Sequence, residues 1–221
     1  MKRTALVTGG SRGIGAAIKA RLQAEGMDVI APGRSELELS STRSIDAYLR
    51  SFSGPVDVIV NNAGINNLAS LEEITPEALE SMMQVNLSAP LRLIQGLAPV
   101  MKRNRYGRIV NMSSVFGMVS KERRLLYTAT KSSLIGITKT LAIELGPFNI
   151  LVNALAPGYV MTALTRQNNS EEDIERISVN IPLRRMADPA EIAEVAAFLC
   201  SDRNTYLSGQ TIVVDGGFTC M

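Results

Sequence analysis

Residues 4–15 read TALVTGGSRGIG, and this stretch decides the fold. A short apolar, β-prone run from Thr4 to Val7 leads directly into a turn with glycines at positions 9, 13 and 15. Isoleucine and small residues follow at helical spacing as far as Leu22, and Gly26 marks the end of that helix. A strand, a glycine turn and a helix in this order place backbone N–H groups and a positive helix end beneath a pyrophosphate. The spacing differs from the GxGxxG fingerprint, so a purely structural turn stays an alternative.

The alternation of strands and helices continues along the chain. Near-continuous apolar runs predict buried parallel strands, and segments with helix start signals separate them. This alternation predicts one α/β domain over residues 1–221, with a Rossmann-type, doubly wound parallel sheet. The predicted strands after the first are 28–31, 56–60, 108–112, 150–155 and 210–214, and the longest predicted helix runs from Thr75 to about Asn104 with a bend near Pro90.

The connection after the second strand is unusually short. Residues 36–39, ELEL, follow the strand 28–31 after a small gap, and Ser41 to Phe52 has the pattern of the next helix. Neighbouring parallel strands need a crossover of about a dozen residues, which this gap cannot supply. The helix that would separate the second strand from a third strand at residues 37–39 is therefore predicted to be missing or vestigial. Residues 37–39 are expected to form a stub or an extended loop at the sheet edge.

Composition argues against several classes of function. The 221 residues carry a formal net charge of +2, which gives no support for nucleic-acid or membrane-surface binding. No apolar run approaches the ~20 residues of a membrane span, and the N-terminus does not resemble a secretory signal, so we expect a cytoplasmic protein. The chain has no histidine, which removes Ser-His-Asp chemistry and histidine metal sites, and we expect no metal. Cys200 and Cys220 are expected to be free thiols, with a disulfide as the alternative.

A candidate proton-transfer site lies in residues 111–131, NMSSVFGMVSKERRLLYTATK. Tyr127 and Lys131 are four residues apart, so on a helix they share a face. A lysine ammonium beside the phenol favours the phenolate and lowers the tyrosine pKa below its usual ~10. Such a tyrosine can act as a general acid or base near neutral pH, and Ser114 could hold a substrate oxygen against its hydroxyl. The tyrosine–lysine pair alone is a weak signal.

Residues after the second predicted strand bear on nucleotide choice. In dinucleotide-binding folds an acidic residue near this strand end binds the ribose 2′-hydroxyl and selects NAD, whereas an arginine accommodates the 2′-phosphate of NADP. Gly33 and Arg34 stand where the acid is expected, and Arg12 lies in the glycine loop. Two arginines and no acid favour NADP(H) over NAD(H). The alternative is that either arginine is a solvated surface charge.

Seven motifs occur along the chain: TGGSRGIG at 8–15, NNAG at 61–64, Asn86, Ser114, YTATK at 127–131, LAPG at 155–158 and GQTIVVDGG at 209–217. In order and spacing they resemble the single-domain branch of the short-chain dehydrogenase/reductase family, most closely its 3-oxoacyl-[acyl-carrier-protein] reductases. Each motif is weak alone, but together they cover nearly the whole chain. The resemblance implies an NADP(H)-dependent oxidoreductase that interconverts a carbonyl and a secondary alcohol, with a 3-oxoacyl thioester or a sugar-type ketone as substrate.

The resemblance also implies roles for individual residues. Tyr127 would be the catalytic acid/base, Lys131 would lower its pKa and bind the nicotinamide-ribose hydroxyls, and Ser114 would hydrogen-bond the reacting oxygen. Asn86 would anchor a water that relays protons from Lys131 to solvent. Asn62 would contact the adenosine-side ribose, and Val160 and Thr162 the nicotinamide carboxamide. The full set implied to bind the cofactor is Gly9, Ser11, Arg12, Gly13, Ile14, Gly15, Arg34, Glu38, Leu39, Asn62, Ala63, Gly64, Tyr127, Lys131, Pro157, Gly158, Val160 and Thr162.

The chain departs from the family's pattern at the adenine end. Glu38 replaces the usual aspartate, and the preceding helix is absent from the sequence pattern. The polar residues 163–185 are expected to form a mobile lid over the substrate. The resemblance further implies a homotetramer, paired through the helices that carry Asn86 and Tyr127 and through the final strand region.

Two alternatives to this function stay open. One is a catalytically silent dinucleotide-binding regulator on the same fold. The other is a sugar-nucleotide epimerase or dehydratase, whose relatives share the tyrosine–lysine spacing but usually carry a longer C-terminal substrate domain. Basic residues could also attract an anionic substrate, although solvated charge is the simpler interpretation; they are Lys121, Arg123, Arg124, Arg184 and Arg185.

Overall fold

The structure, a computed structural model, describes residues 2–52 and 54–220. Within these residues, six parallel strands form one sheet in the order β2-β1-β3-β4-β5-β6. The predicted Rossmann-type, doubly wound parallel sheet is therefore confirmed. The strands are β1 (Thr4–Val7), β2 (Asp28–Ile30), β3 (Val58–Asn61), β4 (Gly107–Met112), β5 (Ile150–Pro157) and β6 (Thr211–Val214).

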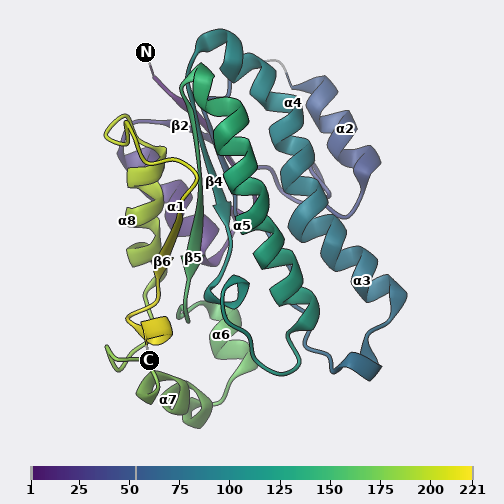
Figure 1. Cartoon of the computed structure of the whole chain (residues 1–221), viewed down its shortest axis with the longest axis vertical. Helices are drawn as coiled ribbons and strands as arrows, with labels where there is room; N and C mark the ends of the chain where they lie inside the picture. The colour runs from purple at the N-terminus through teal and green to yellow at the C-terminus, as the bar shows by residue number, and fades with distance from the viewer. Residues whose placement is uncertain (1, 53, 221) are drawn as a thin grey trace.

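Helices cover both faces of the sheet (Figure 1). α1 (Gly13–Ala24) and α8 (Pro189–Cys200) pack together on one face, and α4 (Ala89–Asn104) and α5 (Leu125–Leu145) lie on the other. α3 (Pro76–Met83) precedes α4, and α2 (Thr42–Ser51) packs against α4. α6 (Ala163–Asn168) and α7 (Glu171–Val179) lie beyond the carboxyl ends of the strands, at the bottom of Figure 1. In the described part of the chain, no helix has both the length and the hydrophobicity to cross a membrane.

The two halves of the core follow from the alternation of side chains along the strands. On β3, Val58 and Val60 pack into the cluster beneath α1 and α8, whereas Ile59 packs into the cluster beneath α4 and α5. β1 repeats the arrangement, because Ala5 lies on the first side and Leu6 on the second. Successive strand residues point to opposite faces, so a strand covered on both faces is apolar at nearly every position.

The prediction for residues 37–39 is confirmed, because they form a loop and no strand. Leu37 is buried in a small apolar cluster with Ile45 of α2 and Leu93 of α4. α2 then provides the crossover from β2 to β3, which passes over β1. The sheet therefore ends at β2, and no further strand in the described residues extends it on that side.

The long helical region from α3 to α4 is broken at a π-helical turn, Gln84–Ser88. The sequence predicts a bend near Pro90, which lies two residues after this turn and has no N–H to donate to the preceding helical turn. The wider turn falls just before it and contains Asn86. Single π turns inside helices occur frequently at functional sites, so the position of this one is informative.

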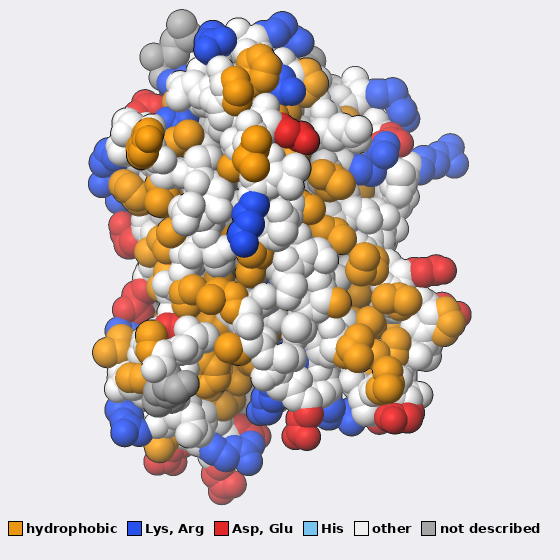
Figure 2. Space-filling view, viewed as in Figure 1, with side chains coloured by type: hydrophobic (Ala, Val, Ile, Leu, Met, Phe, Trp, Pro, Cys, Tyr) orange, Lys and Arg blue, Asp and Glu red, His pale blue; other side chains and the backbone are white. Residues whose placement is uncertain are grey.

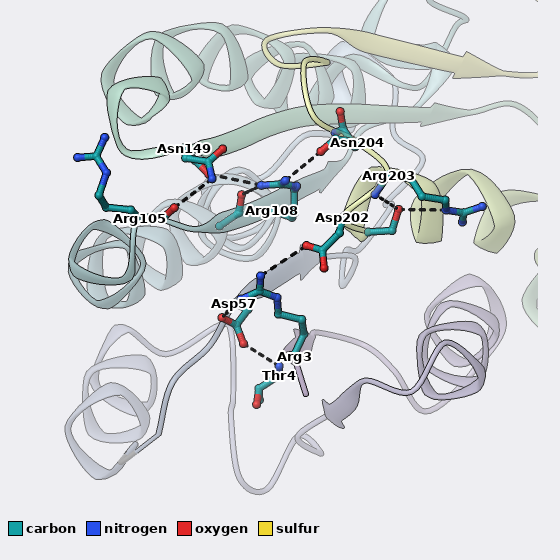
Figure 3. A network of polar contacts seen from close by, with 11 residues as sticks. Arg3, Thr4, Asp57, Arg105, Arg108, Asn149, Asp202, Arg203 and Asn204 are labelled. Atoms are coloured by element: carbon teal, nitrogen blue, oxygen red, sulfur yellow. Dashed lines mark hydrogen bonds and ion pairs between the residues drawn. The ribbon is translucent and has the colours of Figure 1, made fainter. Parts of the chain in front are cut away.

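A polar network ties the amino ends of the strands together (Figure 3). Arg3 contacts the carboxylates of Asp57 at 3.4 Å and Asp202 at 3.5 Å, and Asp57 also accepts a hydrogen bond from the backbone N–H of Thr4 at 2.9 Å. The buried guanidinium of Arg108 donates to the carbonyl of Asn204 at 2.9 Å. The starts of β1, β3 and β4 are thus fixed at the edge of the sheet opposite the glycine loop.

Arg108→Met is expected to lower the free energy of unfolding by about 2–3 kcal/mol, because buried carbonyl groups lose a charged donor. Urea unfolding followed by circular dichroism measures this change. Arg103→Met, at an exposed position near the end of α4, is the matched control and is expected to change stability by less than about 0.5 kcal/mol. Equal stabilities of the two variants would contradict the stabilising role of the network.

Candidate functional site

The candidate residues gather at the carboxyl edge of the sheet. In open α/β sheets, ligands bind outside the carboxyl ends of the strands, where the strand order reverses. Here the chain moves outward from β1 to β2 and then returns to β3 on the other side of β1. The glycine loop follows β1 and the NNAG segment 61–64 begins at the end of β3, so both lie at this reversal point.

The glycine loop leaves no room for side chains at its closest approach. A Cβ atom on Gly15 would lie 2.2 Å from the carbonyl oxygen of Gly9 and 2.4 Å from the Nδ2 atom of Asn62. Gly9 and Gly13 have φ angles of +67° and +56°, in the left-handed region that glycine adopts without strain. The loop therefore presents backbone groups at the start of α1.

The N-terminus of α1 carries no side-chain cap. Arg12 occupies the N-cap position without a capping hydrogen bond, and the first turn contains no acidic residue. By contrast, the hydroxyl groups of Ser41 and Thr75 cap α2 and α3. The first N–H groups of α1 are thus left to bind an anion, with the positive end of the helix behind them. Together with the glycine loop, this arrangement fits the diphosphate of a dinucleotide.

Asn62 joins the loops that follow β1 and β3. Its Nδ2 atom donates to the carbonyl oxygens of Thr8 at 2.9 Å and Gly9 at 3.3 Å. In return, the Thr8 hydroxyl oxygen accepts from the backbone N–H groups of Asn62 and Ala63, at 3.0 and 3.1 Å. The side chain that the resemblance assigns to a ribose thus also shapes the glycine loop, and Thr8 is a supporting residue that sequence reasoning missed.

Asparagine side chains also link the ends of β3 and β4. Asn61 donates to the Oδ1 atom of Asn111 at 2.9 Å, and Asn111 donates to the Thr138 hydroxyl on α5 at 2.9 Å. All three residues are buried. α5 is therefore fixed to the sheet on the segment that carries the tyrosine–lysine pair.

Ser113 and Ser114 follow β4 and meet the start of α5. The Ser113 hydroxyl donates to the carbonyl oxygen of Lys131 at 2.9 Å, and the buried Lys131 Nζ atom donates to the carbonyl oxygen of Met112 at 2.7 Å. Ser114 is close enough to the Tyr127 side chain to act on its pKa. The Nζ atom of Lys131 lies 5.6 Å from the centre of the Tyr127 ring. The structure thus brings Ser114, Tyr127 and Lys131 together.

The pKa of Tyr127 shifts in the direction opposite to the one expected from the sequence. Burial raises the pKa of Tyr127, while the hydrogen bond with Ser114 and the positive charge of Arg124 act to lower it. Burial also lowers the pKa of Lys131, to about 8. The net lowering of the tyrosine pKa expected from Lys131 is therefore not found, because loss of water around the phenol outweighs the groups that favour the phenolate.

Asn86 lies beside the same group. In the π-helical turn its Oδ1 atom accepts from the backbone N–H of Ile65 at 2.8 Å, and its Nδ2 atom donates to the Ile65 carbonyl at 2.9 Å and to the Thr130 hydroxyl at 3.2 Å. A Cβ atom on Gly64 would lie 3.3 Å from Asn86 Oδ1 and 3.5 Å from Lys131 Nζ. The end of the NNAG segment, the π-helical turn and α5 therefore meet at one point.

The segment after β5 closes another side of the site. Pro157 ends β5, and a Cβ atom on Gly158 would lie 2.8 Å from Asp215 after β6. Val160 forms a bridge with Ala187 and is buried, and the Thr162 hydroxyl caps α6. A Cβ atom on Gly13 would lie 3.4 Å from the Thr162 side chain, so this segment and the glycine loop are neighbours.

The residues expected at the adenine end are paired with one another. Arg34 is exposed, and its Nε atom lies 3.2 Å from the Oε2 atom of Glu38. Hydrogen bonds from Ser40 lower the pKa of Glu38, and Arg34 adds to the effect. Leu39 is half-buried beside the Leu37 cluster, and its carbonyl oxygen accepts from Gln84 at 3.1 Å. The loop 33–41 is thus held by its own polar contacts and by α2 and the π-helical turn.

Of the five basic residues considered for an anionic substrate, Arg124 is the one that lies over the Tyr127 ring. Its guanidinium carbon lies 4.3 Å from the centre of the Phe116 ring and 5.9 Å from that of Tyr127. Arg123 instead pairs with Glu73 at 2.8 Å, and Arg185 with Glu191 at 2.6 Å. Sequence reasoning treated all of these cations alike. The spacing of three residues between Arg124 and Tyr127 is the signal that distinguishes Arg124, since such positions are neighbours at a helix start.

The glycine loop, the uncapped start of α1 and the tyrosine–lysine pair at one edge of a Rossmann-type sheet define a dinucleotide-dependent oxidoreductase. Residues 38–219 match the family described as enoyl-(acyl carrier protein) reductase. The chain belongs to the short-chain dehydrogenase/reductase family and is an NAD(P)-dependent oxidoreductase that acts on CH–OH groups of a small-molecule substrate.

Individual relatives span nearly the whole chain. The 3-oxoacyl-[acyl-carrier-protein] reductase MabA of Mycobacterium bovis is 38% identical, over 98% of this chain and 93% of that protein. The 3-oxoacyl-[acyl-carrier-protein] reductase FabG of Aquifex aeolicus is 37% identical, over 97% and 96%. The crystal structure of a gluconate 5-dehydrogenase from Burkholderia cenocepacia, in complex with NADP and tartrate, has a TM-score of 0.89 at 27% identity and covers 100% of this chain and 97% of that one.

Arg124→Gln is expected to raise the pKa of Tyr127 further, because removal of a nearby positive charge favours the neutral phenol. Titration of carbon-13-labelled tyrosine by NMR measures the shift, with the signal assigned by its loss in Tyr127→Phe. Arg123→Gln is the matched control, because the Arg123 side chain is turned toward Glu73, and it is expected to leave the titration unchanged. A Tyr127 pKa that is unchanged or lower in Arg124→Gln would contradict the expectation.

Proposed function

We propose that the chain interconverts a carbonyl and a secondary alcohol with NADP(H), and that Tyr127 is the acid/base. The observation that carries the proposal is the meeting of Asn86, Ser114, Tyr127 and Lys131, from separate elements, beside a glycine loop that fits a dinucleotide. Ser114 hydrogen-bonds the reacting oxygen. Tyr127 donates its proton to that oxygen in reduction and takes a proton from the hydroxyl group in oxidation.

Lys131 serves the tyrosine in two ways in this proposal. Its ammonium group stabilises the phenolate that remains after proton donation, and it binds hydroxyl groups of the nicotinamide ribose. A pKa near 8 lets the group exchange protons close to neutral pH, so it can return a proton to Tyr127. Asn86, next to the Lys131 Nζ atom across Gly64, anchors the water through which that proton arrives from solvent.

The cofactor residues divide along the carboxyl edge of the sheet. The backbone of residues 9–15 and the start of α1 hold the diphosphate, while Asn62, Ala63 and Gly64 approach the ribose on the adenosine side. Pro157, Gly158, Val160 and Thr162 hold the nicotinamide end. When bound, NADP(H) supplies or accepts the hydride, and the protein supplies position and electrostatics.

Arg34 is the residue proposed to select NADP(H) over NAD(H). It follows β2, where an acidic residue would instead favour NAD. Its partner Glu38 is half-buried and held by Ser40, whereas the Arg34 side chain is 83% exposed and free to turn toward a 2′-phosphate. The related gluconate 5-dehydrogenase bound to NADP supports this choice. Glu38 and Leu39 would then lie near the adenine, in a loop that lacks the family's usual helix.

The substrate proposed is a ketone of the 3-oxoacyl-thioester or sugar type, after the relatives with those activities. Residues 163–185, which include α6 and α7, lie beyond the carboxyl ends of the strands and are proposed as a lid that closes over this substrate (Figure 1). The proposed location is cytoplasmic, in keeping with the unpaired thiols of Cys200 and Cys220.

Self-association as a homotetramer is part of the proposal. Exposed apolar side chains gather over α3 and the segment before it, where Figure 2 shows a cluster of hydrophobic groups. Leu71 is 69% exposed, and Ile143 on α5 is 78% exposed. Apolar surface of this kind marks protein–protein contacts when it is contiguous. These residues belong to the helical side of the molecule, which the resemblance assigns to subunit pairing.

Tyr127→Phe is expected to reduce turnover of ketones with NADPH by about 10²–10⁴-fold, the usual contribution of a positioned acid/base. Loss of nicotinamide absorbance measures turnover on a panel of 3-oxoacyl thioesters and sugar-type ketones. Tyr206→Phe is the control, because Tyr206 is 96% exposed and should keep full activity. Full turnover by Tyr127→Phe would rule out the mechanism. Tight NADPH binding by the wild type with no turnover on the whole panel would favour a catalytically silent regulator.

Arg34→Ala is expected to raise the dissociation constant for NADPH about 10-fold and to leave that for NADH nearly unchanged, because only the 2′-phosphate loses a charged partner. Isothermal titration calorimetry with both nucleotides measures the ratio. Arg103→Ala removes an exposed charge from the end of α4 and is the matched control. An equal loss of affinity for both nucleotides would contradict the role of Arg34.

A further inference from the structure

Three aromatic side chains from separate segments form a wall next to Ser114. Phe116 and Tyr159 meet edge to face, with ring centres 5.9 Å apart and an angle of 89° between the ring planes. Tyr159 and Phe218 repeat this geometry at 5.5 Å and 89°. Edge-to-face packing is a favourable arrangement of aromatic rings and holds each ring in a defined position. The wall, Phe116–Tyr159–Phe218, is therefore a preformed surface.

The aromatic wall lines a cavity of about 290 Å³. Val119, Ser120, Lys121 and Thr219 complete its described lining, in which Lys121 is the one charged residue. Ligand pockets usually measure about 300–1,000 Å³. The cavity is therefore just below that range and suits a small substituent of a substrate.

The wall is coupled to the proposed catalytic group by short links. The backbone N–H of Phe116 donates to the Ser114 hydroxyl oxygen at 3.2 Å. The Arg124 guanidinium lies over both Phe116 and Tyr127. Tyr159 directly follows Gly158 in the segment proposed to hold the nicotinamide end. A substrate whose carbonyl oxygen lies between Ser114 and Tyr127 can therefore extend a substituent toward the wall.

Two hydroxyl groups in the lining of the cavity are already engaged within the protein. The Ser120 hydroxyl is hydrogen-bonded to that of Thr128 at 3.0 Å, and the Thr219 hydroxyl donates to Asp215 at 2.6 Å. A hydroxylated substituent that packs against the ring faces gives up water and gains no hydrogen-bond partner there, at a cost of about 1–3 kcal/mol for each unpaired group. An alkyl or aryl substituent instead gains by covering the rings.

From this geometry we infer that Phe116, Tyr159 and Phe218 are specificity-determining residues, which bind an alkyl or aryl substituent on the ketone carbon and disfavour a polyhydroxylated one. The inference rests on the proposed function and deepens it, because it chooses between the two substrate types considered there. It assigns the chain to apolar ketones, including 3-oxoacyl compounds, rather than to sugar-type ketones.

Two six-carbon ketones, 2-hexanone and fructose, provide the test with the NADPH-bound protein. The wild type is expected to show the higher kcat/KM for 2-hexanone. Phe116→Ala and Phe218→Ala are expected to lower that value about 10-fold or more and to affect fructose less, because full burial of an apolar side group contributes about 1.5–3 kcal/mol. Tyr206→Ala is the control aromatic deletion, and thermal melting checks that each variant is folded.

Saturation-transfer NMR of 2-hexanone with NADPH-loaded Tyr127→Phe adds a readout that needs no turnover. Binding that weakens in the double variants Tyr127→Phe/Phe116→Ala and Tyr127→Phe/Phe218→Ala supports the inference, even if the wild type turns over neither ketone and the proposed function fails. Equal losses for both ketones, a wild-type preference for fructose, or 2-hexanone binding unaffected by both deletions would overturn it.

Discussion

The hydrogen bonds of the Asn62 side chain hold together the two loops on which the site depends. Its amide donates to the carbonyls of Thr8 and Gly9, and the space it occupies is available only because residue 15 is glycine. These contacts set the position of the glycine loop at the start of α1. The NNAG segment is fixed at the same time, and its far end, Gly64, lies against Asn86 and Lys131. The Asn62 amide thus helps to position both the loop proposed to bind the diphosphate and the segment that reaches the proposed proton-transfer residues.

Burial affects the pKa values of both proposed proton-transfer residues, Tyr127 and Lys131, and a nearby positive charge also affects that of Tyr127. Burial disfavours the charged forms of both Tyr127 and Lys131, so it raises the pKa of the tyrosine and lowers that of the lysine. Arg124 adds a positive charge near the phenol, and its guanidinium also lies over Phe116 of the aromatic wall. In the proposed mechanism, acid–base tuning and substrate selection therefore share a side chain.

Much of the fold follows from local sequence pattern. Apolar runs identified the strands because both faces of the sheet are covered, and the short gap before Leu37 identified the loop that replaces a strand. The motifs located Tyr127, Lys131, Ser114 and Asn86, but the net direction of the tyrosine pKa depends on burial, which spacing does not reveal. The aromatic wall was missed for a related reason. Phe116, Tyr159 and Phe218 are distant in sequence, and only the return of β5 and β6 beside β4 brings them together.

The end of the sheet at β2 has a consequence for how copies of the chain behave in solution. An edge strand offers unpaired backbone groups that can recruit strands from other molecules and start aggregation. β2 is three residues long, begins with the charged Asp28, which pairs with Lys2, and is followed two residues later by Pro32, which has no N–H to offer. Short length, charge and proline each discourage intermolecular pairing. The chain thus has protection against fibrous association at the β2 edge of its sheet.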